Sequence, residues 1–131
     1  MEKRLPVTFE TVRDIALTYP GVEEGMSFGT PALRVRGKFM ARLREDGETL
    51  VIKASETERE FRMTVDPATF FITEHYRGYS AVLVRLARVS VEDLADLIEQ
   101  SWRWLAPRKL VAEYERAHPG QPATFSFGEI E

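Results

Sequence analysis

The side chains best suited to recognition chemistry gather in residues 75–79, which read His-Tyr-Arg-Gly-Tyr. An imidazole, two phenols and a guanidinium can form hydrogen bonds, stack on flat rings or contact a phosphate. Val82, Val84 and Leu86 follow at alternate positions, as expected for a strand with one buried face. The pattern predicts a recognition loop that leads into a strand, without the nucleophile, base and acid of a catalytic set.

Other candidate catalytic groups are weaker. Residues 25–29 read Gly-Met-Ser-Phe-Gly, the spacing of a nucleophile elbow around Ser27, but this motif needs a strand before it and a helix after it. Here it follows a predicted helix and precedes Pro31 and a strand, so we expect Ser27 to be a loop residue. His75 and His118 lack the spacing of metal ligands, and the chain has no cysteine. We therefore predict no metal, no cofactor and no enzymatic activity.

The charges are distributed unevenly along the chain. The net charge is −3, which opposes indiscriminate binding to nucleic acid. Residues 31–54 nevertheless carry six basic and three acidic side chains, a sum of +3, whereas residues 91–131 carry four basic and eight acidic ones, a sum of −4. The sequence thus predicts one basic and one acidic layer, and the basic layer could neutralise phosphates.

The first half of the chain predicts a helix followed by three strands. Thr8 is a candidate N-cap, and apolar residues then recur at helical spacing up to residue 19. Strands over residues 30–36 and 39–44 are joined by a tight turn at Gly37, and a third strand covers residues 49–54.

The second half predicts a short helix, two strands and two helices. Ser55 and Ser90 each precede a capping-box spacing, and the helix after Ser55 should turn Phe61 and Val65 inward. Strands over 70–73 and 81–87 form a hairpin or a crossing between neighbours. A long helix after Ser90 places Trp102 on its apolar stripe, and a last helix runs from Pro107 to about 117. Residues 119–131 form either an edge strand, with Phe125 and Phe127 alternating, or a flexible tail.

The order α-βββ-α-ββ-αα indicates an α+β two-layer sandwich, with an antiparallel sheet and helices on one face. The 131 residues have the size of one domain, spanning 1–131. The absence of cysteine and of a membrane-length apolar run favours a cytoplasmic protein without membrane contact. Trp104 lies off the apolar stripe. It either fills a contact with the last helix or belongs to a dimer seam, so a monomer and a weak homodimer both remain open.

Local motifs across most of the domain resemble the MmcQ/YjbR family of small bacterial proteins. They lie at residues 19–24 (Tyr-Pro-Gly-Val-Glu-Glu), 27–31 (Ser-Phe-Gly-Thr-Pro), 36–43, 70–73 and 75–79. The resemblance implies a two-layer fold of the CyaY or secretion-chaperone type and DNA binding through a double-wing surface. Many family members carry a Pro-Trp or Gly-Trp pair where this chain has Ser80 and Ala81, so a stacking role for that tryptophan is lost.

Strand alternation extends this expectation to particular residues. If Leu33, Val35, Ala41, Leu43, Leu50 and Ile52 face the helices, the basic side chains between them lie on the opposite face. With the recognition loop, the predicted nucleic-acid-binding residues are Arg34, Arg36, Lys38, Arg42, Arg44, Lys53, His75, Tyr76, Arg77, Tyr79 and Arg85.

Three alternatives stay open. The basic side chains could form a solvated face paired with Glu45 and Glu48, and the tyrosines could cap a core. The chain could be a protein-interaction module, as the chaperone-like architecture suggests. An enzyme would require Ser27, His75 and Arg77 to share one cavity.

Overall fold

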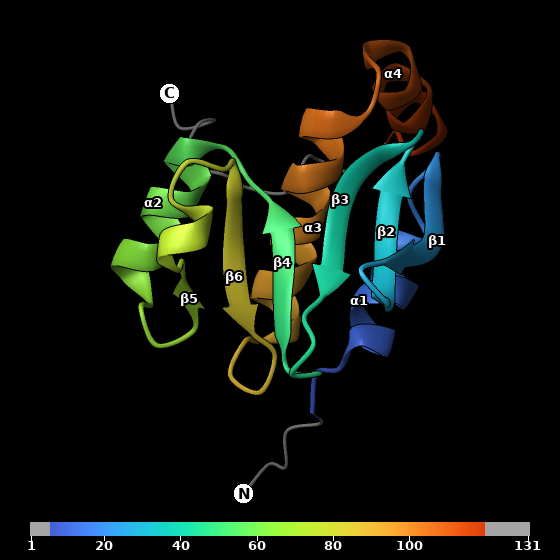
Figure 1. Cartoon of the computed structure of the whole chain (residues 1–131). Coiled ribbons are helices and arrows are strands. Elements are labelled where there is room, and N and C mark those ends of the chain that lie inside the picture. The colour runs from blue at the N-terminus through green and yellow to red at the C-terminus, as the bar shows by residue number, and fades with distance from the viewer. Residues whose placement is uncertain (1–5, 120–131) are drawn as a thin grey trace, which may run out of the picture.

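The computed structural model describes residues 6–119 as a six-stranded antiparallel sheet with helices packed on one face (Figure 1). This confirms the predicted α+β fold class. The elements in chain order are α1 (Phe9–Ala16), β1 (Val22–Ser27), β2 (Thr30–Val35), β3 (Lys38–Leu43), β4 (Thr49–Lys53), α2 (Glu56–Val65), β5 (Phe70–Phe71), the short 3-10 helix η1 (Glu74–Tyr76), β6 (Ala81–Arg85), α3 (Val91–Leu105) and α4 (Arg108–Ala117).

The strands follow one another in space as β1-β2-β3-β4-β6-β5. The first four form a meander, and α2 then carries the chain past β6 to the far edge. There β5 pairs with β6, with Phe70 opposite Val84, so the two strands form the predicted hairpin rather than a crossing. The residues between β5 and β6 therefore connect the edge strand β5 to its neighbour β6 at one side of the sheet.

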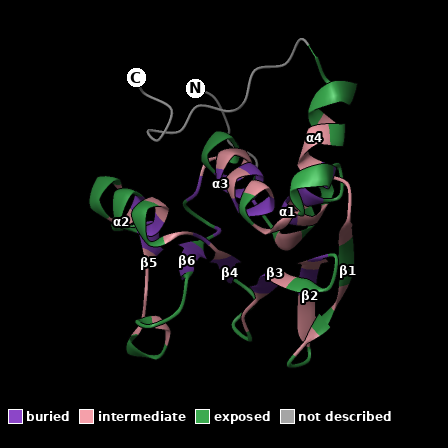
Figure 2. Cartoon of the chain, turned by 90° about the horizontal axis from the view of Figure 1, so that it is seen from above, coloured by how far each residue is buried: buried purple, intermediate pink, exposed green. Residues whose placement is uncertain are grey.

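The main core lies between the sheet and the helices. Alternate residues of β4 and β6, such as Leu50 and Val84, are fully buried against α1 and α3. Burying one such aliphatic side chain contributes about 1.5–3 kcal/mol. Trp102 of α3 is also fully buried, and its Nε1–H donates a hydrogen bond to the carbonyl of Pro20 at 2.9 Å. In Figure 2, α1, α3 and α4 cover one face of the sheet, and the connection between β5 and β6 projects from the other.

Capping side chains set the predicted helix starts. The hydroxyl of Ser55 accepts a hydrogen bond from the Glu58 N–H, and that of Ser90 accepts one from the Asp93 N–H. The first helix is shorter than predicted: α1 ends at Ala16. The structure also adds β1 at residues for which the sequence predicted a loop.

Helix α2 buries side chains other than those predicted. Phe61 and Val65 are 42% and 65% exposed, whereas Arg59 and Arg62 are buried. The Arg62 guanidinium pairs with Glu58 and with Asp96 of α3, and it lies over the ring of Phe70. The prediction that Phe61 and Val65 point inward is therefore wrong, because ion pairs to α3 select the opposite side of the helix.

Trp104 is half exposed, and the Lys53 ammonium of β4 lies 5.7 Å from the centre of its ring. The contact with the last helix and the dimer seam both stay predictions for this side chain. Across residues 6–119, none of the helices combines the length and apolarity needed to cross a bilayer. The tail alternatives for residues 120–131, including Phe125 and Phe127, lie outside the described residues.

Candidate functional site

A cavity of about 550 Å³ opens on the sheet face that α1 and α3 leave uncovered. Its floor comes from side chains that alternate with the core residues of β3, β4 and β6: Phe39, Val51 and Ala81. These belong to a second apolar cluster, separate from the main core. The volume is typical of sites that hold a small organic group.

One wall of the cavity consists of three rings from the β5–β6 connection. The rings of His75 and Tyr76 stand 4.8 Å apart at 89°, His75 and Tyr79 are 5.5 Å apart at 85°, and Tyr76 and Tyr79 are 5.7 Å apart at 77°. Three planes that are pairwise nearly perpendicular form a corner. A flat ligand can therefore stack on one ring while its edge meets the face of another.

The ring corner is fixed to the rest of the fold. Arg59 of α2 is buried, and its Nη1–H donates a hydrogen bond of 2.7 Å to the carbonyl of Tyr79. The next carbonyl, that of Ser80, accepts a hydrogen bond of 3.1 Å from the N–H of Ala54. A charge-assisted hydrogen bond and a backbone hydrogen bond thus hold the end of the loop before β6 begins.

The opposite wall is the tip of the β1–β2 hairpin, where Phe28 and Gly29 form a two-residue turn with φ of 54° and 80°. Positive φ at both central residues is the type I′ pattern, which matches the twist of paired strands but strains a residue other than glycine. Phe28 is 83% exposed, so packing does not account for its place there. Its ring lies 5.2 Å from the guanidinium carbon of Arg42.

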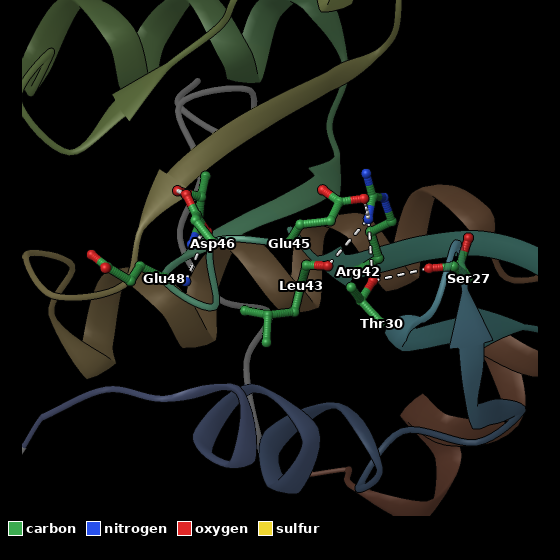
Figure 3. A network of polar contacts seen from close by, with 8 residues as sticks. Ser27, Thr30, Arg42, Leu43, Glu45, Asp46 and Glu48 are labelled. Atoms are coloured by element: carbon green, nitrogen blue, oxygen red, sulfur yellow. Dashed lines mark hydrogen bonds and ion pairs between the residues drawn. The ribbon is translucent and has the colours of Figure 1, made fainter.

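Arg42 connects this tip to the end of β3 (Figure 3). Its Nη1 donates hydrogen bonds to the Thr30 hydroxyl at 3.1 Å and the Leu43 carbonyl at 3.3 Å, and lies 3.5 Å from a Glu45 carboxylate oxygen. The Thr30 hydroxyl in turn donates to the Ser27 carbonyl at 2.9 Å. Arg42 is therefore largely committed to holding the hairpin tip, with its guanidinium at the edge of the cavity.

The other predicted cations are distributed over several parts of the surface. Arg34 projects from the same face of the sheet as Arg42, and its Nη1 reaches the Met26 carbonyl at 3.5 Å. Lys53 lines the cavity. Arg85 lies 4.0 Å from the centre of the Phe71 ring and donates a hydrogen bond to the Ala68 carbonyl.

Two of the predicted cations lie elsewhere. Arg36 occupies the β2–β3 turn with φ of 49° and lies beside Leu110 of α4 rather than on the open face. Lys38 pairs with Val35 in the register, which places it on the side of the sheet that Val35 shares with the helices. The geometry therefore does not bring Arg36 and Lys38 together with the recognition loop. Arg44 follows β3 and is only partly exposed.

Arg77 does not line the cavity. Its guanidinium forms two hydrogen bonds with the Glu74 carboxylate, at 2.8 and 3.1 Å, and these hold the pKa of Glu74 below its usual value. The same hydrogen bonds raise the pKa of Arg77. Because both side chains are exposed, the pair adds little to stability.

Ser27 and His75 line the same cavity from opposite walls, without Arg77. Within the described chain, the structure records no hydrogen bond between the two side chains, whereas a nucleophile and its base lie within hydrogen-bond reach of each other. The same residues, 6–119, contain no cluster of three carboxylate or histidine side chains placed to hold a metal ion.

Sequence reasoning missed the contributions of Phe28 and Arg59. A signal for Phe28 exists, because Phe28-Gly29 lies between two segments that can pair, and a two-residue loop ending in glycine predicts a hairpin. Arg59 carries no such signal. Its partner is a backbone carbonyl twenty residues further along the chain.

Comparisons with known proteins agree with this fold. The family model described as YjbR matches residues 17–104. Uncharacterized protein Mb2600 of Mycobacterium bovis and uncharacterized protein Rv2570 of Mycobacterium tuberculosis are each 39% identical to the chain over 69 residues, covering 52% of this chain and 54% of theirs. The chain thus matches about half the length of these relatives. The crystal structure of Deinococcus radiodurans protein DR2400, with the domain DUF419, aligns over 95% of this chain and 96% of that one with a TM-score of 0.66 at 21% identity.

Proposed function

Because this chain belongs to the YjbR family, we propose that it is a DNA-binding protein that uses the open face of its sheet. The observation that carries the proposal is the cavity, in which an aromatic corner and two cations, Arg42 and Lys53, share one concave surface. Aromatic platforms beside positive charge are the two parts from which binding surfaces for nucleic acids are built. The β1–β2 tip and the β5–β6 connection flank this surface as two projecting walls.

The placement of the cations sets the expected strength of the electrostatic term. Arg34, Lys53 and Arg85 are on or beside the open face, and among the described residues none of the three forms an ion pair. Each phosphate neutralised on duplex DNA lowers the slope of log K against log salt by about 0.9. Two or three phosphate contacts would therefore give a slope of about −2 to −3, shallower than six free cations would produce.

The test is fluorescence anisotropy with labelled duplex and single-stranded oligonucleotides across a salt series. The double variant Arg34→Gln/Lys53→Gln removes two positive charges from the open face. The double variant Arg36→Gln/Lys38→Gln removes the same charge from the β2–β3 turn and is the matched control. We expect only the first variant to weaken binding. It should also make the slope of log K against log salt shallower by about 1.8, which corresponds to the loss of two phosphate contacts on a duplex.

Two outcomes would contradict this proposal. Equal weakening by both variants would mean that overall charge, rather than the open face, determines binding. No binding by the unaltered protein at low salt would remove the DNA-binding function altogether.

We also propose that the site binds rather than catalyses. Arg42 is engaged in holding a hairpin, and Ser27 faces His75 across the cavity instead of bonding to it. These arrangements support recognition of a ligand without activation of a nucleophile. Incubation with generic ester, phosphoester and nucleotide substrates should give no turnover, and turnover that is lost in Ser27→Ala would contradict this.

A protein-interaction module is the second candidate. The exposed side chains at the β1–β2 tip favour it: Phe28 is 83% exposed and Met26 is 61% exposed. An exposed aromatic side chain is a common anchor in protein interfaces. A defined protein partner whose binding is lost in Phe28→Ala, together with the absence of DNA binding at low salt, would favour this candidate over the first.

A further inference from the structure

We propose that the cavity takes a single unpaired nucleobase, so that the protein prefers single-stranded or locally opened DNA to an intact duplex. This inference rests on the DNA-binding function proposed above and specifies its ligand. It follows from the shape of the aromatic wall, the strained position of Phe28 and the small number of free cations.

The ring corner requires an exposed flat face. His75, Tyr76 and Tyr79 stand nearly perpendicular to one another, so a flat group entering the corner stacks on one ring and places its edge against another. In a duplex the faces of the bases are covered by their neighbours, and a protein reaches them only by extruding the nucleotide or by binding an unpaired strand. The rings therefore match a base outside the stack.

The two walls border one cavity that has room for a base. The tip between β1 and β2 and the connection that leads into β6 both contribute side chains to the cavity of about 550 Å³. This volume is typical of sites that hold a small organic group. Phe28 on one wall can close over a base that rests against Tyr79 on the other.

The polar groups that line the cavity can form hydrogen bonds with the edge of a base and contact its flanking phosphates. Arg42 and Glu45 lie together near the β1–β2 tip and offer a donor and an acceptor. Ser80 and Lys53 line the cavity beside the ring corner. With two cations and one carboxylate among the lining residues, the cavity has a charge near +1, which suits a ligand bound more by stacking than by phosphate contacts.

The conformation of Phe28 supports a ligand-binding role for this residue. A phenylalanine at φ of 54° with 83% of its surface exposed is strained in its backbone and gains little from burial. Strained residues of this kind cluster at ligand clamps. Stacking on a ligand would add a second partner to the Arg42 guanidinium, which lies 5.2 Å from the centre of the ring.

The experiment compares three probes by anisotropy or competition at one salt concentration: a single-stranded oligonucleotide, the same sequence as a duplex, and a free deoxynucleoside monophosphate. Phe28→Ala and Tyr79→Ala remove one ring from each wall. Phe61→Ala, an exposed phenylalanine on α2, is the matched control. We expect the single strand to bind at least tenfold more tightly than the duplex, and each wall variant to weaken single-strand binding about tenfold with the control unchanged.

A second readout follows the base itself. A 2-aminopurine in the single strand should change its fluorescence on binding to the unaltered protein and to Phe61→Ala, and should not do so with Tyr79→Ala. Equal affinity for single strand and duplex, with no effect of the wall variants, would overturn this inference while leaving DNA binding in place. Loss of all DNA binding would remove both proposals. Free nucleotide binding as tightly as the oligonucleotide would overturn it in favour of a small-molecule site.

Discussion

Replacing Phe28 separates the strain at the β1–β2 tip from the recognition that we assign to its ring. Phe28 has φ of 54°, and its ring lies over the Arg42 guanidinium at 5.2 Å. Alanine removes the ring but keeps a side chain that disfavours positive φ, whereas glycine removes both. We therefore predict that Phe28→Gly is more stable than Phe28→Ala, while the two variants lose the same amount of single-strand binding.

The magnitudes follow from the two contributions. Both variants lose the cation–π contact, which is worth about 0.5–1 kcal/mol at an exposed site. Only glycine regains the cost of the left-handed conformation, about 1–2 kcal/mol. The free energy of unfolding of Phe28→Gly should thus exceed that of Phe28→Ala by about 1–2 kcal/mol. Each kcal/mol corresponds to a thermal midpoint about 4 °C higher. Urea and thermal unfolding measure the difference.

Phe61 provides the control because it lies in the interior of α2 and is 42% exposed. In a helix interior, glycine is less stable than alanine by about 1 kcal/mol, so Phe61→Gly should fall below Phe61→Ala. The order of the two variants must therefore invert between the two positions. If Phe28→Ala were as stable as Phe28→Gly, the positive φ at the tip would carry no strain, and its use as support for a ligand clamp would fail.

Three further predictions concern groups that position the site. Arg59→Met should lower the free energy of unfolding by about 1–3 kcal/mol in urea unfolding and weaken single-strand binding, because the Tyr79 carbonyl loses a charged donor; unchanged binding would limit Arg59 to stability. The Glu48 N–H, with further hydrogen bonds from the turn, lowers the pKa of Asp46, so its contribution to stability is present above the unfolded pKa and is lost as pH falls through the lower folded value. In Asp46→Asn, the free energy of unfolding should therefore decrease less steeply as the pH falls below about 4. If it decreased as steeply as in the unaltered protein, this prediction would be contradicted. Trp102→Phe leaves a backbone acceptor after α1 without its donor and should lower the thermal midpoint by an amount equivalent to about 1–3 kcal/mol; a change near zero would show that water replaces the indole.

Local signals predicted most of the fold because they act over a few residues. The serine caps at 55 and 90 and the alternation in β4 and β6 depend on near neighbours, and the structure confirms them. Strand β1 was missed because Glu23 and Glu24 are consecutive and both exposed, which breaks the alternation. As an edge strand it depends on pairing with β2, and its own side chains carry little of the signal.

The inward face of α2 shows where such reasoning stops. The sequence places two apolar residues at helical spacing, and burial of Phe61 and Val65 was the natural prediction. The structure buries Arg62 instead, because Asp96 lies 34 residues away along the chain and reaches it from α3. The candidate site likewise has one part that local sequence predicts and one part that depends on contacts between distant segments. The ring loop was predicted from its composition, whereas the participation of Phe28 depends on which strands the sheet brings together.

The balance of charge and stacking at the site has a consequence for selectivity. The net charge is −3, and the cavity itself is near +1, so phosphate contacts contribute only part of the binding free energy. For each phosphate contact, the slope of log K against log salt is about −0.9 on a duplex and about −0.7 on a single strand. Stacking on the rings does not depend on counterion release. The ratio of single-strand to duplex affinity should therefore rise between 50 and 200 mM salt, by about twofold for two or three phosphates. A ratio that falls with salt would mean that phosphate contacts, rather than the aromatic corner, distinguish the two ligands.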